Sequence, residues 1–261
     1  MTLVTLTTDF GLSDPFVGIM KGVILGRAPA ATIVDVTHGI PPQDVLAGAL
    51  VLRHALPYFP PGGVHVAVVD PGVGGARRPL CVETATGYLV GPDNGLLSLA
   101  APPAAIRRIV HLTEDRFFLS PRSTTFHGRD IFAPVAAAIA AGTSASVLGV
   151  EVPEIHRLDV PSPVEEDGHL RGQVIYVDHF GNLVTNVGIE TLPGSSERRW
   201  AVRIRDAHIR GIVPSYAAVA PRELVAVVNS WGLVEVAVRD GSARERLGAG
   251  VGERVLFEDA G

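Results

Sequence analysis

Ionisable side chains follow apolar runs at several points in the first half of the chain. Asp9 comes just after the run Leu3–Thr7, and Asp70 comes directly after Val64–Val69. His127 precedes an alanine-rich segment. In open α/β sheets, ligands bind beyond the carboxyl ends of the strands, so side chains at these places line the binding crevice. Carboxylates and an imidazole that meet there can orient a water molecule or remove its proton.

The segment after Asp70 is rich in glycine, at positions 72, 74 and 75, and continues with Arg77. Glycine allows the backbone to approach a ligand closely. The glycine spacing matches neither a P-loop nor a dinucleotide-binding fingerprint. An arginine seven residues after Asp70 can fold back to pair with that carboxylate and keep it charged. The alternative is a tight turn that carries a surface arginine.

A carboxylate placed as Asp9 is suited to accept both hydroxyls of a ribose. Two further aspartates have a structural alternative. Asp14 precedes the helix predicted at Val17–Arg27 and could cap it, and Asp130 is an N-cap candidate ahead of the alanine-rich helix. The segment Gly91–Gly95 has the composition of a turn, and we interpret it mainly as structural.

No strong metal or nucleophile motif accompanies these residues. Asp9, Asp70, Asn94 and His127 are possible metal ligands in principle, but no HxxxH, HxH or DxD spacing supports a metal site. No serine lies in a nucleophile-elbow motif. The one cysteine, Cys81, can form neither an internal disulfide nor a thiolate metal site, which fits a reducing, cytoplasmic setting.

The composition of the whole chain limits the classes of function. The 261 residues are 47% hydrophobic and 19% charged, which excludes disorder and allows a substantial core. A net charge of −5 provides no sequence-wide basic field for nucleic acid. The uncharged stretch 131–150 contains proline, glycine and serine, as a buried helix and a turn would, and no targeting signal is evident. We expect neither a nucleic-acid nor a membrane partner.

Two parts of the chain differ in rhythm. Residues 1–155 alternate short β-branched runs with helical segments, which is typical of a layered, Rossmann-like α/β domain. Residues 156–168 contain prolines and charges without a clear period, and we interpret them as a linker. Residues 169–261 consist of short β-type runs between turns, which predicts a smaller antiparallel β-barrel or sandwich. The predicted elements are strands at Leu3–Thr7, Thr32–Val36, Val64–Val69, Gly172–Val177, Asn182–Val187, Trp200–Ile204, Leu224–Asn229, Val234–Arg239 and Arg254–Phe257, and helices at Val17–Arg27 and Gln43–Leu56.

The second part offers polar groups around its turns. Asp178 and Asn182 bracket an aromatic–glycine turn, and Tyr216 and Ser230 lie in two further turns. Asparagine amides can pair with a purine edge, and tyrosine can stack on one. Hairpins with Asx-turn chemistry are the alternative, which the residues by themselves favour.

Seven motifs occur in order from residue 2 to about residue 256. They are TTDFGLSDPFVGIMKG, VDVTHGIPPQDVLAGA, VAVVDPGVGGARRPL, VGPDNGLL, TFHGRDIFAP, VDHFGNLVTN and NSWGLVEVAV. Each is weak alone, but the ordered set resembles the S-adenosyl-L-methionine (SAM) hydroxide adenosyltransferase family, also called adenosine-forming SAM hydrolases. That family is related to the SAM-dependent fluorinase and chlorinase.

The resemblance implies an N-terminal α/β domain and a C-terminal β-barrel-like domain in a homotrimer. It implies that SAM binds between the N-terminal domain of one subunit and the C-terminal domain of the next. It also implies that water or hydroxide attacks C5′ of the ribose and releases methionine and adenosine, without a metal or organic cofactor.

Carried over motif by motif, the resemblance assigns the handling of water to Asp70, Arg77 and His127. The implied substrate-binding residues are Asp9 (ribose), Asp14 and Asp178 (methionine), Asn182 and Tyr216 (adenine), Ser230 (methionine) and Val238 (purine, through its backbone).

Departures from the halogenases favour water as the nucleophile. The halogenases carry tyrosine where this chain has Asp70, and an aromatic residue where it has Gln43. A carboxylate repels a desolvated halide. Trp231 stands where the fluorinase has arginine, which removes a charge clamp for the substrate carboxylate. The alternatives are a SAM-dependent halogenase, a metal-dependent phosphoesterase, and a non-catalytic protein that senses SAM or adenosine.

Overall fold

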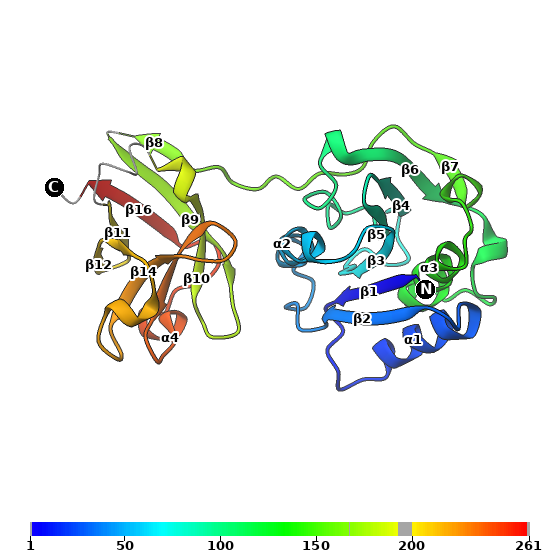
Figure 1. Ribbon diagram of the computed structural model, residues 1–261, viewed down its shortest axis with the longest axis horizontal. Helices are drawn as coiled ribbons and strands as arrows, with labels where there is room; N and C mark the ends of the chain where they lie inside the picture. The colour runs from blue at the N-terminus through cyan, green and yellow to red at the C-terminus, as the bar shows by residue number, and fades with distance from the viewer. Residues whose placement is uncertain (1, 167, 193–199, 260–261) are drawn as a thin grey trace. The chain divides into compact units, whose positions relative to one another are not determined.

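The computed structural model describes residues 2–166, 168–192 and 200–259. The chain forms two compact units, Met1–Asp159 (unit 1) and Val160–Gly261 (unit 2), each with its own sheet and core (Figure 1). The architecture is therefore mixed α/β with two large sheets. Among the helices of the described residues, none combines the length and apolar character that crossing a bilayer requires.

Unit 1 is built on a seven-stranded sheet in the order β2-β1-β3-β5-β4-β6-β7. Its strands are β1 (Leu3–Thr8), β2 (Thr32–Thr37), β3 (Gly63–Val68), β4 (Pro79–Thr84), β5 (Gly87–Pro92), β6 (Ile106–Leu112) and β7 (Gly149–Glu151). The strands β2, β1, β3 and β5 are parallel, and β4, β6 and β7 extend the sheet through antiparallel pairs. Cys81 of β4 is fully buried, and burial, together with nearby Glu83, raises the pKa of its thiol to about 12.

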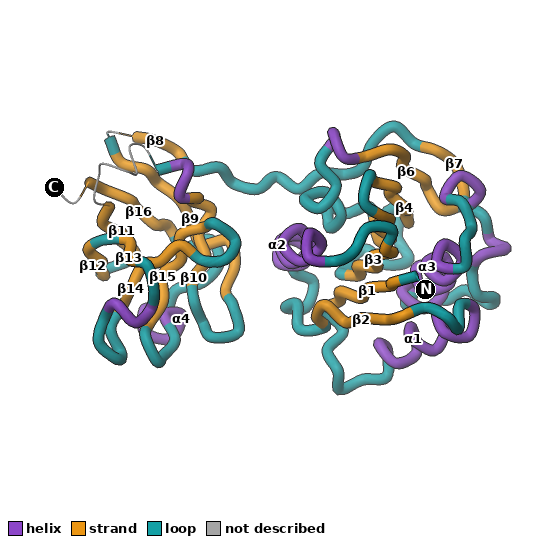
Figure 2. The backbone as a smooth tube through the Cα atoms, in the orientation of Figure 1, coloured by secondary structure: helices purple, strands orange, loops and turns teal. Residues whose placement is uncertain are grey.

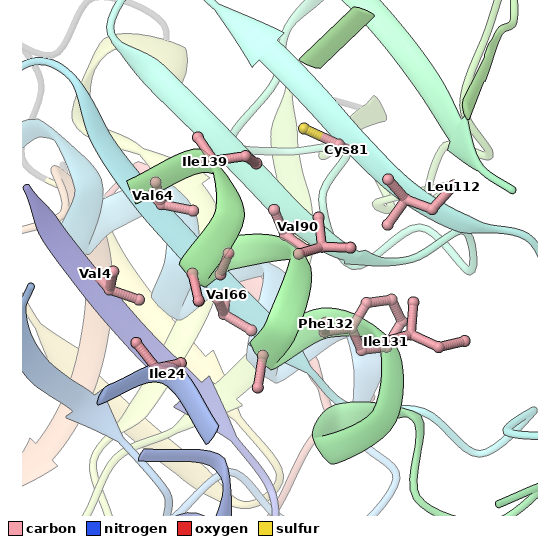
Figure 3. Packing of buried hydrophobic residues seen from close by; sticks show 14 of the residues in the cluster. Val4, Ile24, Val64, Val66, Cys81, Val90, Leu112, Ile131, Phe132 and Ile139 are labelled. Carbon is pink, nitrogen blue, oxygen red and sulfur yellow. The ribbon is translucent and has the colours of Figure 1, made fainter. Parts of the chain in front are cut away.

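One face of this sheet is covered by α1 (Phe16–Arg27) and α3 (Ala133–Ala140). Figure 3 shows Ile24 of α1 and Ile139 of α3 among side chains of the strands, including Val4 of β1. Successive side chains of a strand point to opposite faces, so the even-numbered residues of β1 and β3 build this core. The alanine-rich segment thus forms a buried helix, as predicted.

The opposite face is covered by α2 (Val45–Ala55), whose Gly48 lies close to Val69 and Leu96. A Cβ at Gly48 would press on both side chains, so the absence of a side chain sets the short distance between helix and sheet.

The N-termini of the helices differ in how they are capped. The carboxylate of Asp44 accepts from the backbone N of Ala47 over 2.9 Å and caps α2. In α1 the cap position is Pro15, and no side chain caps the helix. The cap predicted at Asp14 is therefore wrong, because Asp14 lies one residue before the cap position.

Unit 2 contains a nine-stranded sheet in the order β12-β11-β16-β9-β10-β15-β14-β13, with β8 paired to β9 (Figure 2). Its strands are β8 (Val164–Glu166), β9 (His169–Val177), β10 (Leu183–Gly188), β11 (Trp200–Ile204), β12 (Ala207–Arg210), β13 (Ile212–Val213), β14 (Leu224–Val228), β15 (Leu233–Val238) and β16 (Arg254–Asp259). Strand pairs are antiparallel except β13 with β14, which is parallel. The sheet curls until β11 lies near β13 and β12 near β14, which gives a nearly barrel-like shape.

The core of unit 2 lies inside this curled sheet. Val174, Val202, Val236 and Phe257 are fully buried in it, and α4 (Ala243–Leu247) packs beside β15. The alternation of buried and exposed side chains along the strands matches a sheet with one inner face.

The predicted strands and helices are present in both units, with ends shifted by at most three residues. The sequence does not predict the strands β4 to β7 or the two short strands β12 and β13. The strand β8 lies within residues 156–168, which the sequence predicts to be a linker, and it pairs with β9.

Candidate active site

Asp70, Arg77 and His127 form one hydrogen-bonded group in unit 1. Arg77 donates to both carboxylate oxygens of Asp70, from Nε over 2.9 Å and from Nη2. The same Nη2 lies 2.7 Å from Nδ1 of His127. The side chains of Asp70 and Arg77 are 5% and 9% exposed, so little solvent weakens the ion pair. The pairing predicted from their spacing is confirmed.

The protonation of His127 follows from its partner. Arginine can only donate, so Nδ1 of His127 accepts the hydrogen bond from Arg77, and the proton of the neutral ring lies on Nε2. Burial and the guanidinium of Arg77 lower the pKa of His127 below its ordinary value. At neutral pH the ring is therefore a neutral donor. Arg77 and His127 also line a cavity of about 510 Å³.

Two close contacts position this group. The side chain of Asn94 donates to the carbonyl oxygen of Val69, just after β3, over 2.8 Å. Gly74 has a φ of +76°, and a Cβ there would collide with the carbonyl oxygen of Thr124. Only glycine allows this loop to lie so close to the segment that carries His127.

His127 immediately precedes a π-helical turn, η4 (Gly128–Phe132), that leads into α3. Asp130 lies buried inside this turn and accepts from the backbone N of Ser123 and from Arg129. Burial opposes ionisation, but the hydrogen bonds from Arg129 and Ser123 hold the pKa of Asp130 below its ordinary value. The N-cap predicted at Asp130 is wrong, because this carboxylate fastens the preceding loop instead. Single π-helical turns are frequent at functional sites.

Asp9 follows β1 at the same edge of the sheet as Asp70, since β1 and β3 are parallel neighbours. Its Oδ2 accepts from the backbone N of Gln43 over 2.8 Å. Gln43 has a φ of +67°, a left-handed conformation that is unusual for a residue with a side chain. The hydrogen bond from this unusual backbone conformation holds the carboxylate of Asp9 in place. Asp14 is exposed ahead of α1.

An aromatic cluster joins the segments of Asp9 and His127. The rings of Phe10, Phe16 and Phe126 pack edge to face, with centroids 5.2 to 5.9 Å apart. Phe10 follows Asp9, and Phe126 precedes His127. The structure therefore brings the segment that carries Asp9 next to the segment that carries His127.

The residues predicted for the substrate in unit 2 line two adjoining cavities. One cavity of about 450 Å³ is lined by Asp178, Tyr216 and Ser230. The other, of about 600 Å³, is lined by Asp178, Asn182, Tyr216 and Val238. Since Asp178 and Tyr216 belong to both, all five residues face one connected region.

Asp178 and Asn182 also close the turn between β9 and β10. Oδ1 of Asp178 accepts from the backbone N of Phe180 and of Asn182, and Oδ2 accepts from the Asn182 side chain over 2.8 Å. The Asx-turn alternative is confirmed. It is compatible with a contact to a ligand, because Oδ2 of Asp178 accepts only one of these bonds and keeps a further lone pair.

Glu235 of β15 was not among the predicted residues, although it lines the 450 Å³ cavity. It is 3% exposed, and its two oxygens accept from the hydroxyl of Tyr216 and from the side chain of Asn229. Burial and the hydrogen bond to Glu235 raise the pKa of Tyr216. One charged residue inside the apolar run of NSWGLVEVAV was the signal that could have identified it.

Residues 2–166, 168–192 and 200–259 contain no group of three or more His, Cys, Asp or Glu side chains that could hold a metal ion. Two of the side chains named above as possible metal ligands have other partners. Asp70 pairs with Arg77, and Asn94 donates to a backbone carbonyl.

Comparisons of the sequence with family models and with named proteins indicate the same family. The model of the SAM hydroxide adenosyltransferase N-terminal domain matches residues 4–149, and that of the C-terminal domain matches residues 172–256. A protein of Salinispora tropica named (R)-S-adenosyl-L-methionine hydrolase is 44% identical, covering 97% of this chain and 96% of its own. One of the same name from Thermus thermophilus is 42% identical, covering 95% and 96%. A fluorinase from Actinoplanes sp. is 29% identical and covers 71% of each chain.

A solved structure agrees with these relatives. An uncharacterized conserved protein from Thermotoga maritima matches with a TM-score of 0.90 at 33% identity, covering 98% of this chain and 99% of that one. Both domain models match in order, and the identity to named hydrolases exceeds 40% over nearly the full length. The chain belongs to the SAM hydroxide adenosyltransferase family.

Proposed function

We propose that this protein hydrolyses S-adenosyl-L-methionine to adenosine and L-methionine. The observation that carries the proposal is the hydrogen-bonded group of Asp70, Arg77 and His127, with its nearly buried ion pair, in a chain of this family. Such a group can hold a water molecule and take up one of its protons. The named relatives act on this substrate according to their names.

In the proposed reaction, a water oxygen attacks C5′ of the ribose in line with the C5′–S bond. As the C5′–O bond forms, the C5′–S bond breaks, and its electron pair neutralises the sulfonium, which leaves as the thioether of methionine. One water proton passes to the carboxylate of Asp70, and the 5′-hydroxyl of adenosine keeps the other. His127 donates from Nε2 to the water oxygen, and Arg77 fixes Asp70. Orientation of this kind can contribute up to ~7–11 kcal/mol.

The charge at position 70 supports water over halide. A desolvated chloride or fluoride beside the carboxylate of Asp70 would be repelled, whereas water can donate a proton to it. The names of the relatives carry the (R) descriptor of the sulfonium sulfur. We propose that the (R) epimer is the preferred substrate, since a site that holds both the adenosine and the methionine chain leaves only one position for the methyl group on sulfur.

For the substrate contacts we propose the roles that the family resemblance implies, and the five residues of unit 2 among them line its two cavities. They are Asp9 for the ribose, Asn182, Tyr216 and the backbone of Val238 for adenine, and Asp14, Asp178 and Ser230 for methionine. We propose residues 1–155 as a Rossmann-like catalytic domain, 156–168 as a linker and 169–261 as a β-barrel domain. In this proposal the protein is a homotrimer, and the last domain completes the site of a neighbouring subunit.

We propose that the reaction needs no metal or organic cofactor. A sulfonium is already a good leaving group, so no Lewis acid is required to activate the sulfur. We also propose a cytoplasmic location, where SAM is available and the lone cysteine stays reduced.

The proposed function is tested by incubating the protein with each sulfonium epimer of SAM in chloride-rich buffer, with and without chelator. Chromatography is expected to find adenosine and methionine, faster from the (R) epimer, at a rate that chelator does not change. Chlorinated adenosine would indicate a halogenase, loss of activity with chelator would indicate a metal enzyme, and binding without turnover would indicate a sensor. Asp70→Asn serves as the inactive control.

The shared site is tested by mixing two inactive variants. Asp70→Asn lacks the proton acceptor of unit 1, and the double variant Asn182→Ala with Tyr216→Ala lacks binding groups of unit 2. If subunits exchange in a trimer with shared sites, random mixing at equal amounts restores roughly a quarter of the sites. No recovery in exchanged trimers would mean that each subunit forms its own site.

A further inference from the structure

A buried carboxylate in unit 2 connects two loops. Glu235 of β15 is 3% exposed. Its Oε1 accepts from the hydroxyl of Tyr216, which begins η7 (Tyr216–Ala218), and its Oε2 accepts from the side chain of Asn229 over 2.9 Å. Tyr216 lies in the loop that precedes β14, and Asn229 lies in the turn directly after it, so the carboxylate connects the loop before that strand to the turn after it.

The amide of Asn229 can face Glu235 in only one orientation. Its Oδ1 accepts from the backbone N of Trp231 over 2.9 Å and of Leu233 over 3.2 Å. Its Nδ2 must therefore point toward an acceptor, which is the carboxylate of Glu235. Because the same turn carries Ser230, the carboxylate fixes the place of that turn relative to the tyrosine ring.

The strand itself does not require a charge at this position. Leu233 and Ala237, which lie on the same face of β15 as Glu235, are apolar, and Ala237 is fully buried. Burial of a carboxylate costs free energy that two hydrogen bonds offset only in part. Glu235 lines the 450 Å³ cavity together with Tyr216 and Ser230. The buried carboxylate of Glu235 therefore lies where it can determine the shape of this cavity.

We propose that Glu235 is a positioning residue of the substrate site, which bridges Tyr216 and Asn229 so that the tyrosine ring and the Ser230 turn form one preformed wall. The inference rests on the proposed function, in which this cavity receives part of SAM. A preformed wall reduces the ordering cost of binding. Glu235 then acts on KM through other residues and does not touch the reacting atoms.

Two substitutions separate the bridge from its charge. Glutamine keeps both links, because its Oε1 accepts from Asn229 while its Nε2 donates to the oxygen of Tyr216. Leucine has a similar volume and removes both links. We expect Glu235→Leu to raise KM for SAM at least ~10-fold with kcat within ~3-fold of wild type, and Glu235→Gln to recover KM to within ~3-fold.

A matched control and a second variant complete the test. Thr185→Val removes another buried polar contact of the same sheet, the bond from Thr185 to the carbonyl of Val234, and it is expected to lower Tm without changing KM. Tyr216→Phe removes one link of the bridge. It is expected to raise KM ~3-fold or more, and to have no further effect in the Glu235→Leu background.

The outcomes distinguish the bridge from the function itself. Lack of SAM turnover by the wild-type protein would overturn the proposed function. If the wild-type protein does turn over SAM, an unchanged KM in folded Glu235→Leu would overturn the proposed role of Glu235 and leave the proposed function intact. A KM in Glu235→Gln as high as that in Glu235→Leu would also overturn this role. If Glu235→Leu does not fold, an unchanged KM in Tyr216→Phe overturns it.

Discussion

Unit 1 and unit 2 use buried charge in different ways. In unit 1 the cationic Arg77 lies between the carboxylate of Asp70 and the ring of His127. In unit 2 the carboxylate of Glu235 is held by neutral partners, a phenol and an amide. A charge-paired group can change protonation during a reaction, whereas neutral partners hold a shape. Changes to Asp70, Arg77 or His127 in unit 1 are therefore expected to lower kcat, and changes to the Glu235 bridge in unit 2 to raise KM.

The largest expected effect is that of Asp70→Asn. The amide keeps the size of the side chain but cannot take up a proton, so kcat is expected to fall at least ~10²-fold, while the Kd for SAM changes little. Adenosine release and calorimetric binding measure the two quantities. A variant that retained most of its kcat would remove the distinction between the units.

The second prediction concerns the stability of the folded protein at low pH, to which His65 of unit 1 is expected to contribute. His65 is buried, and burial lowers its pKa to about 4. Between pH 6.5 and 4 the unfolded chain binds more protons at this residue than the folded chain. The free energy of unfolding is therefore expected to decrease as the pH is lowered from 6.5 to 4, by at most about 3 kcal/mol from His65. Below pH 4 this contribution is expected to level off.

Urea unfolding at pH 7 and pH 4.5 measures this loss, and His65→Gln is expected to show a smaller one. In the described part of unit 2, the buried polar side chains are Asn182, Thr185 and Glu235 and include no histidine. Hydrogen exchange, corrected for its intrinsic pH dependence, is therefore expected to rise more in unit 1 than in unit 2. Equal slopes for His65→Gln and wild type would contradict the assignment.

A smaller effect is expected from Asp9→Asn. The amide oxygen can still accept from the backbone N of Gln43, but only one oxygen remains to receive the ribose hydroxyls. We expect KM to rise ~10-fold, about 1.4 kcal/mol, with kcat reduced less. Adenosine binding measured by calorimetry is expected to weaken by the same factor. Unaltered adenosine affinity would argue against the ribose contact.

The smallest predicted effect is that of Ser230→Ala, which removes one hydroxyl from the exposed turn of the 450 Å³ cavity. KM for SAM is expected to rise ~3-fold, the value of a single hydrogen bond, with kcat unchanged. Ser146→Ala, at an exposed serine of unit 1, is the matched control. An effect on kcat instead of KM would weaken the division of labour between the units.

Local patterns predict part of this molecule well. The spacing of Asp70 and Arg77 predicts their ion pair correctly, because a short loop rich in glycine can return the arginine to the strand end. Apolar β-branched runs also predict the parallel strands β1, β2 and β3 of unit 1. The antiparallel half is less predictable, because the residues between β4 and β6 include proline and glycine in positions that indicate turns.

Hydrogen-bond partners that the local pattern does not indicate explain the remaining differences. The position of Asp130 before an alanine-rich helix predicts a cap, but the backbone of Ser123 and the side chain of Arg129 bind this carboxylate. Glu235 accepts a hydrogen bond from Tyr216, which lies nineteen residues earlier in the chain. A pattern along one strand indicates which face a side chain occupies, and it does not reveal which loop returns to meet that side chain.

The burial of Cys81 has a practical consequence. It is the only cysteine of the chain, it is fully buried in β4, and its raised pKa keeps the thiol protonated. A maleimide or disulfide reagent can modify it only when the central strands of unit 1 separate. The native protein therefore carries its own single-site reporter, and the rate of labelling records how often one half of the molecule opens.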